Sequence, residues 1–225
     1  GYMNGSRYYG EDLPINTWYM KRFAGLSEDG LSLWYYTDKE TNEEKTTTTY
    51  STGDFYLCGD PNPDLYGGFG TSITFHGFDL STQFSYLVGG LTYDYGYAGM
   101  MGNPTATSVG NRWHKDVLKA WSPENPSSTI PRWYFNDLNT TGSSDRFLID
   151  GSYLNLQNIQ VGYTLPDSWT SHLKIKNLRL YFVCDNVYYW SKRKGLDPRR
   201  SISGVGTSGK IAPFRTYSGG ISLQF

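Results

Sequence analysis

The feature that most constrains this chain is a two-residue alternation of apolar and polar side chains that recurs in five segments. These segments are residues 69–75, 78–88, 158–165, 178–185 and 217–225. Successive side chains of an extended strand point to opposite faces, so each segment predicts a β-strand with one apolar and one polar face. No residue on the apolar faces is charged, whereas Asp79, Arg179 and Asp185 lie on the polar faces.

The clearest element is a β-hairpin, in which His76 and Gly77 separate two alternating segments. A two-residue link that contains glycine is typical of a tight hairpin turn, although His-Gly is less favoured than Asn-Gly. The apolar face of this hairpin comprises Phe69, Thr71, Ile73, Phe75, Phe78, Leu80, Thr82, Phe84, Tyr86 and Val88.

Two architectures explain a sheet with one apolar face. In a soluble sandwich that face points to a packed core, and in an outer-membrane barrel it points to lipid.

A composition with 38% hydrophobic residues is at first sight typical of a soluble protein, yet aromatic residues reach 17% and there are 26 glycines. Aromatic runs crowd the strand ends, at residues 34–36, 93–97 and 187–190, where a membrane barrel has its aromatic girdles.

The connections also favour the barrel. Residues 76–77 form a very short link, whereas residues 89–150 and 191–213 form very long ones. Outer-membrane barrels have short periplasmic turns and long extracellular loops, whereas sandwiches usually turn every 8–12 residues or so. We therefore predict an all-β chain whose strands belong to a large antiparallel transmembrane barrel.

Charge and cysteine content exclude several other classes. The formal net charge is −1 and no Lys/Arg stripe is present, so nucleic acid is not an expected partner. No apolar run has the length of a transmembrane helix, and no signal peptide is visible. Cys58 and Cys184 allow at most one disulfide.

The chain begins Gly1-Tyr2-Met3, from which we expect a processed protein or a piece of a longer one.

Catalytic and metal-binding patterns are missing. His76, His114 and His172 are scattered, which gives no support for a zinc site or a Ser-His-Asp arrangement. Carboxylates such as Asp60 and Glu124 have no feature that sets them apart from ordinary turn residues. We predict no catalytic residue, no metal and no cofactor.

The long connections carry the candidate ligand or partner residues. Residues 111–121 predict a helix of one to three turns, with Asn111 as N-cap, Ser122-Pro123 as the stop, and Trp113, Val117, Leu118 and Trp121 on one stripe. Such tryptophans either pack on a barrel rim or face a ligand or partner. The candidates for the second role are Trp113, Trp121, Trp133 and Trp190.

An ordered series of motifs resembles the C-terminal barrel region of SusC/RagA-type TonB-dependent transporters. The motifs are Gly59-Asp60-Pro61-Asn62-Pro63, Tyr66-Gly67-Gly68-Phe69, Gly77-Phe78-Asp79-Leu80-Ser81, Trp121-Ser122-Pro123-Glu124-Asn125-Pro126, Asp150-Gly151-Ser152-Tyr153, Val161-Gly162-Tyr163-Thr164-Leu165-Pro166, Lys194-Gly195-Leu196-Asp197-Pro198 and the end of the chain from Arg215 to Phe225. The resemblance covers nearly the whole chain and is weakest before about residue 50.

The resemblance implies that residues 1–225 are the last part of a barrel of roughly 22 strands, six to eight of them in this chain. It implies lumen-facing Asp79, Ser81, Gln83, Ser85, Arg179 and Asp185. It implies lipid-facing Phe78, Leu80, Phe84, Leu178, Leu180 and Phe182. In such families Tyr217, Ile221, Leu223 and Phe225 of a terminal strand resemble an assembly signal, and the last strand closes the barrel.

The resemblance also implies a function. Such transporters sit in the outer membrane of Bacteroidetes-type bacteria and import oligosaccharides, or peptides in some cases, with a SusD-like surface lipoprotein. The expected partners are the remainder of the barrel with its plug, the lipoprotein, TonB through a segment outside these residues, the substrate and membrane lipid. The alternatives are a secreted β-sandwich that binds glycans, and a passive porin.

Overall fold

The computed structural model describes residues 1–105, 112–137, 139, 142–170, 175–200, 203–205 and 213–225. The chain forms two compact units. The first comprises Gly1–Asn62, Gly90–Asp150 and Pro198–Gly209, and the second comprises Pro63–Gly89, Gly151–Asp197 and Lys210–Phe225.

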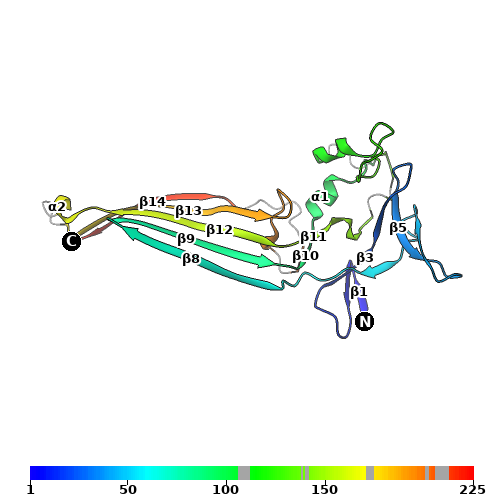
Figure 1. The fold of residues 1–225 in the computed structure, drawn as a ribbon, viewed down its shortest axis with the longest axis horizontal. Helices are drawn as coiled ribbons and strands as arrows, with labels where there is room; N and C mark the ends of the chain where they lie inside the picture. The colour runs from blue at the N-terminus through cyan, green and yellow to red at the C-terminus, as the bar shows by residue number, and fades with distance from the viewer. Residues whose placement is uncertain (106–111, 138, 140–141, 171–174, 201–202, 206–212) are drawn as a thin grey trace. The chain divides into compact units, whose positions relative to one another are not determined.

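The second unit is a single five-stranded antiparallel sheet, with the strand order β14-β13-β12-β9-β8 (Figure 1). Its strands are β8 (Leu65–Phe75), β9 (Phe78–Val88), β12 (Tyr153–Thr164), β13 (Asn177–Ser191) and β14 (Thr216–Gln224). They are 9 to 15 residues long, and about 9–11 residues suffice for a tilted transmembrane strand. All five segments that the alternation predicts are therefore strands.

The predicted hairpin between β8 and β9 is confirmed. His76 has φ 47° and Gly77 has φ 85°, so both turn residues are in the left-handed region that a type I′ turn requires. The register runs from Phe75 opposite Phe78 to Leu65 opposite Val88 without interruption. Strand β8 begins at Leu65, four residues before the predicted start at Phe69.

A β-bulge divides β12 and keeps its apolar side chains on one face. The register with both neighbouring strands shifts between Leu156 and Asn158, which leaves Gln157 unpaired. Leu154 and Leu156 thereby share a face with Ile159 and beyond, although the spacing from 156 to 159 is odd. The alternation predicts only the part of this strand that follows the bulge.

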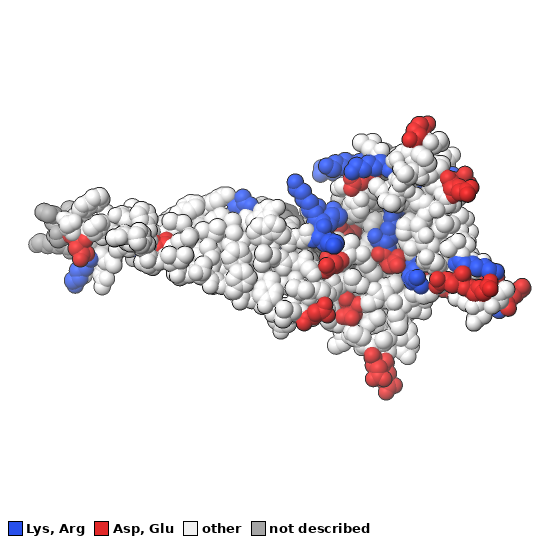
Figure 2. Space-filling model, viewed as in Figure 1, with Lys and Arg blue, Asp and Glu red and all other residues white. Residues whose placement is uncertain are grey.

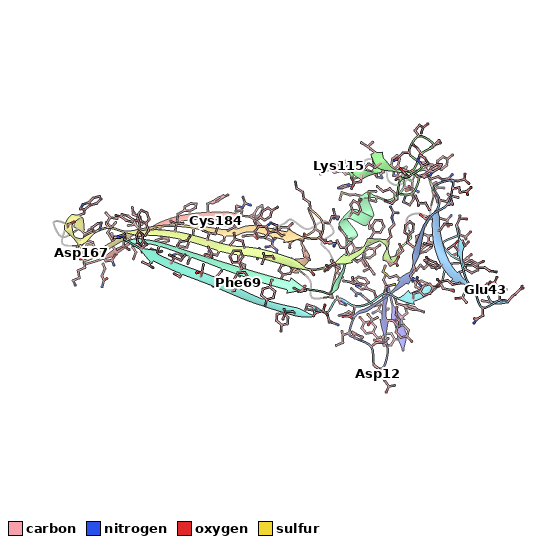
Figure 3. All side chains as sticks on the ribbon, in the orientation of Figure 1. Asp12, Glu43, Phe69, Lys115, Asp167 and Cys184 are labelled. Carbon is pink, nitrogen blue, oxygen red and sulfur yellow. The ribbon has the colours of Figure 1, made fainter. Side chains whose placement is uncertain are left out.

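The connections at the two ends of the sheet differ in length, as predicted. Residues 76–77 and 165–176 make the turns at one end, where α2 (Asp167–Thr170) lies, and Figure 3 labels Asp167 there. Residues 89–152 and 192–215 connect strands at the other end. We call the first of these the turn end of the sheet and the second the long-connection end.

Two expectations need correction. A sandwich would place a second sheet on the apolar face, but the described residues of the second unit form one sheet only. That unit also holds five strands rather than six to eight, because the strands before residue 63 are short and belong to the first unit.

The first unit contains two small sheets and a pair of strands. β1 (Tyr2–Asn4), β2 (Arg7–Tyr9), β3 (Thr17–Lys21) and β7 (Phe55–Leu57) form the first sheet. β4 (Phe23–Leu26), β5 (Ser32–Thr37) and β6 (Glu44–Thr47) form the second, and β10 (Leu91–Tyr93) pairs with β11 (Leu148–Asp150). Its described residues also form helix α1 (Tyr95–Met100) and 3₁₀ helices at Lys115–Lys119, Asp145–Phe147 and Pro198–Arg200.

A buried cluster holds the first unit together. Its members are Trp18, Met20, Tyr93, Met101 and Phe147, and Trp18 donates its indole N–H to the carbonyl of Leu91 at 3.2 Å. These residues come from β3, β10, the C-cap position of α1 and the 3₁₀ helix before β11, so the cluster joins segments that are distant in sequence. Among the described residues, no helix combines the length and apolar character that crossing a membrane requires.

The helix predicted at residues 111–121 is a 3₁₀ helix within the described part of that segment. A 3₁₀ helix spans Lys115–Lys119, and the Nδ1 atom of His114 caps it by accepting from the Asp116 N–H at 3.1 Å. The predicted cap Asn111 lies outside the described residues. Val117 packs against the buried cluster, but Leu118 is 90% exposed, so the predicted apolar stripe is wrong at that position.

Candidate functional site

The register of the long sheet groups its side chains into two faces of opposite character. Residues that are directly paired across neighbouring strands project to the same side. One such row is Phe75, Phe78, Tyr163, Leu180 and Ile221, and the next is Ile73, Leu80, Val161, Phe182 and Gly219. The six residues with a predicted lipid-facing role, namely Phe78, Leu80, Phe84, Leu178, Leu180 and Phe182, all lie on this apolar face.

The apolar face is exposed over most of its length. Ile73 is 58% exposed, Phe78 57%, Phe182 50% and Ile221 65%. Figure 2 shows few charged side chains over the sheet in that view. A contiguous apolar surface of this size on a folded protein marks contact with a partner or with lipid.

Aromatic side chains border the apolar face at both ends. Phe78 and Tyr163 contact each other at the turn end, with ring centroids 4.4 Å apart. Towards the long-connection end, Phe69 stacks on Phe84 at 4.8 Å (Figure 3 labels Phe69). Phe78 and Tyr86 are eight residues apart in β9, which corresponds to roughly 26 Å along an extended strand before tilt is taken into account. That spacing matches the apolar band of an outer-membrane barrel, which is about 25 Å tall.

Trp190 belongs to this face and not to a loop. It lies in β13, opposite Leu154, and its ring packs edge-on against Tyr188 with centroids 4.8 Å apart. The sequence-based expectation of a loop position is therefore corrected, because β13 continues to Ser191.

The opposite face carries polar side chains and one bidentate ion pair. Arg179 donates from Nε to Asp79 Oδ1 at 2.9 Å and from Nη2 to Asp79 Oδ2 at 2.5 Å. The two residues reach across β12 at Gly162, where an added Cβ would lie 2.4 Å from the Asp79 carboxylate. The glycine is thus required by the close approach of these side chains.

The remaining residues with a predicted lumen role lie on this polar face with the ion pair. Ser81, Gln83 and Ser85 are paired with Gln160, Asn158 and Asn155 of β12. Asp185 accepts a hydrogen bond from the Asn158 amide at 2.7 Å. All six predicted lumen residues therefore share one face, and the interaction partners of that face in the complete protein remain a prediction.

Strand β14 carries the predicted assembly residues. Tyr217, Ile221 and Leu223 are paired with Cys184, Leu180 and Leu178, which places them on the apolar face (Figure 3 labels Cys184). Phe225 follows the last strand residue Gln224 and is 73% exposed. Their role in assembly stays a prediction.

Three of the candidate tryptophans are held by contacts within the first unit. The indole N–H groups of Trp113 and Trp133 both donate to the carbonyl of Gly102, at 3.0 and 3.1 Å, and their rings meet edge-on. Trp121 covers Gly30, whose φ of 72° would disfavour any side chain. These contacts indicate a packing role, although Trp133 remains 39% exposed.

A pocket that the sequence reading missed lies beside α1. It has a volume of about 350 Å³ and is lined by Tyr93, Tyr95, Ala98, Gly99, Met101, Gly102, Ser143 and Phe147. The rings of Tyr93 and Tyr95 are 4.4 Å apart. None of the described lining residues is charged, so they suit a neutral ligand better than an ionic one. The cluster of tyrosines at residues 93–97 was the available signal, but it was assigned to a membrane girdle.

Cys58 and Cys184 are both free, and burial raises the pKa of the Cys58 thiol to about 11. Within the described part of the chain, no group of three or more His, Cys, Asp or Glu side chains is placed to hold a metal ion.

Comparison with known proteins identifies relatives along the whole chain. No family model matches it. It is 29% identical to the TonB-dependent receptor P3 of Formosa agariphila over 100% of this chain and 22% of the relative. It is 27% identical to the TonB-dependent receptor SusC of Bacteroides thetaiotaomicron over 79% of this chain and 17% of the relative.

Solved structures give the same result. The chain superposes on the RagAB peptide transporter with a TM-score of 0.74 and 25% identity, over 93% of this chain and 23% of that one. It superposes on the closed-closed state of the RagAB peptide importer with a TM-score of 0.75 and 23% identity, over 100% of this chain and 25% of that one. The chain thus spans about a quarter or less of the length of these proteins.

The long exposed sheet and these relatives agree with the resemblance that the sequence motifs carry. The chain is similar to the barrel portion of TonB-dependent receptors, and SusC and the RagAB transporter are among the proteins that it resembles.

Proposed function

We propose that this chain forms part of the wall and outer loops of a TonB-dependent importer that takes up oligosaccharides or oligopeptides across the outer membrane. The observation that carries the proposal is the two-faced sheet, apolar and exposed on one side and polar on the other, with aromatic borders. The likeness to SusC and to RagAB supports a transporter of this type.

The two units have different roles in this proposal, and residues 1–225 as a whole belong to the barrel with its loops. The second unit supplies five membrane-spanning strands. The first unit, with its short strands and buried aromatic cluster, supplies outer loop structure. The edges of the sheet, β8 and β14, pair with the remainder of the barrel, because an unpaired edge in lipid costs several kcal/mol for each free backbone group, as a rough figure.

The partners of the complete protein follow from the same class. A SusD-like lipoprotein covers the outer loops, a plug fills the lumen against the polar face, and TonB supplies energy through a segment outside these residues. The exposed aromatic residues of the first unit, Trp133 and Tyr134, suit contact with the lipoprotein or with cargo. We propose no covalent chemistry for this chain.

Cargo class is decided by an uptake experiment on the complete importer. Cells that carry or lack the gene are given fluorescent oligosaccharides and fluorescent oligopeptides, with and without an uncoupler of the proton-motive force. The proposal predicts gene-dependent, uncoupler-sensitive uptake of one class. A passive porin would continue to admit cargo in the presence of the uncoupler, which would contradict TonB-driven import.

Co-purification tests the proposed partners. The complete protein, extracted from outer membranes in mild detergent, should bring a plug-bearing portion and a SusD-like lipoprotein, identified by intact mass and peptide mapping. A detergent-independent species of 25.5 kDa without partners would contradict the proposal.

A further inference from the structure

A short basic turn follows β13 at the long-connection end of the sheet. Lys192, Arg193 and Lys194 come directly after Ser191, the last residue of the strand. Because the formal net charge of the whole chain is −1, three consecutive cations are a strong local excess of positive charge. The residues Lys192–Lys194 are called the basic turn below.

The backbone of the basic turn is fixed by local hydrogen bonds. The Ser191 hydroxyl lies 3.1 Å from the carbonyl oxygen of Arg193 and 2.9 Å from that of Leu196, and the Leu196 N–H donates to the Arg193 carbonyl at 3.1 Å. The side chains of Lys192 and Lys194 are exposed. Within the described residues neither ammonium group has an ion pair, so both are available to an anion from outside the chain.

The position of the turn relative to the apolar face decides which anion it meets. Tyr188 and Trp190 lie on that face and form its aromatic border on β13. Lys192 follows Trp190 by two residues, which is roughly 6–7 Å further along the strand. The exposed lysines of the basic turn thus stand just beyond the aromatic border of β13.

We propose that the basic turn binds the phosphate groups of outer-leaflet lipopolysaccharide. This inference rests on the outer-membrane setting of the proposed function, in which the long-connection end faces outward. Basic residues that immediately flank a membrane-embedded segment bind anionic lipid head groups, and a lysine ammonium suits a phosphate as a point charge. An anionic cargo is less suited, because cargo passes along the polar face, whereas the basic turn directly follows the aromatic border of the apolar face.

The test uses the complete importer, purified with its lipoprotein from outer membranes. A double variant, Lys192→Glu with Lys194→Glu, is compared with a control of equal charge change, Lys39→Glu with Lys176→Glu. Both control lysines are exposed, and Lys176 precedes β13 at the turn end, where outer-leaflet lipid cannot reach. Lipopolysaccharide retained after detergent exchange is measured by native mass spectrometry, then again after incubation with added lipopolysaccharide, dephosphorylated lipopolysaccharide or inorganic phosphate.

The expected result is retention by the wild type and the control, and a reduction of at least about fivefold in the basic-turn variant. Dephosphorylated lipopolysaccharide should bind the wild type as weakly as the variant, and inorganic phosphate should compete only at high concentration. Equal retention by all three proteins would overturn the proposal. A variant that keeps its lipid but loses the lipoprotein or an acidic oligosaccharide would assign the turn to that partner instead. Uptake assays on the same proteins report separately on the transport function.

Discussion

At the scale of single residues, Gly162 shows how a missing side chain shapes the polar face. An added Cβ would lie 2.4 Å from Asp79 Oδ1 and 2.5 Å from Arg179 Nη2. We expect Gly162→Ala to separate the ion pair and to lower the free energy of unfolding by about 1–3 kcal/mol, as overpacking generally does.

Denaturant titration of the refolded barrel in lipid vesicles checks this expectation. Gly219→Ala is the matched control, because its Cβ would have only the Tyr181 carbonyl nearby, at 3.8 Å. Equal loss of stability in the two variants would show that strand glycines matter here for their backbone and not for the ion pair.

A single thiol gives a prediction on pH. Burial raises the pKa of Cys58 to about 11, so at pH 8 about one thiol in a thousand is ionised. Because only the thiolate reacts, alkylation of Cys58 in a Cys184→Ala background should be roughly 100-fold slower than that of an unfolded thiol of pKa 9, and should quicken about tenfold for each pH unit up to pH 11. Mass spectrometry of iodoacetamide-treated protein measures both rates. A rate that levels off near pH 9 would contradict the burial of this thiol.

The two faces make opposite demands on neighbouring residues of β12. Ile159 lies in the middle row of the apolar face, between Thr82 and Cys184, and Gln160 lies on the polar face. Ile159→Arg should cost about 2–4 kcal/mol of stability in a bilayer, whereas Gln160→Arg should be tolerated. Urea titration in vesicles gives both values, and a larger loss for the Gln160 variant would reverse our assignment of the faces.

At the scale of elements, the bulge in β12 carries information that the alternation alone did not reveal. Deletion of Gln157 would join Leu156 directly to Asn158 in a regular alternation, so every side chain would keep its face, whereas deletion of Gln160 would turn one half of the strand to the wrong face. We expect the Gln157 deletion to permit assembly and the Gln160 deletion to prevent it. The assay is the mobility of the unheated protein in a detergent gel, and normal assembly of the Gln160 deletion would contradict the two faces of this strand.

The five long strands could be predicted from the sequence because each sustains a two-residue alternation. The bulge was not predicted, because the alternation was followed only from Asn158 onward, and the phase difference between Leu154 and Leu156 and the later Ile159 and Val161 was left out. The first unit was not predicted, because its strands are only 3 to 6 residues long and show no sustained pattern. Its core brings Trp18 together with Tyr93 and Phe147 through contacts distant in sequence, which no local pattern signals.

The site was predictable to a similar degree. The faces of Asp79, Arg179, Leu80 and Phe182 follow from parity within a strand. The roles of Trp113, Trp121 and Trp133 did not follow, because a tryptophan in a loop reads the same whether it packs inward or faces a ligand. Trp113 and Trp133 both bind the carbonyl of Gly102, and Trp121 covers Gly30. These contacts are visible only in the folded structure.

At the scale of the whole molecule, an open sheet of five strands is stable only as part of a larger closed wall. The apolar face and the two strand edges each require a covering that the described residues of this unit do not supply. In the proposed importer, lipid covers the face and the rest of the barrel covers the edges, and the relatives of this chain are several times longer.

The most direct test of this account measures the surroundings of successive residues along β12 in the complete protein. Spin labels are placed one at a time at positions 158–161 in a cysteine-free background and reconstituted in vesicles, and their relaxation by lipid-soluble oxygen and by a water-soluble nickel chelate is recorded. The account predicts high oxygen access at Ile159 and Val161, and low oxygen access at Asn158 and Gln160. Labels that all see water, or that show no two-residue alternation, would contradict the placement of this sheet in the wall of an outer-membrane barrel.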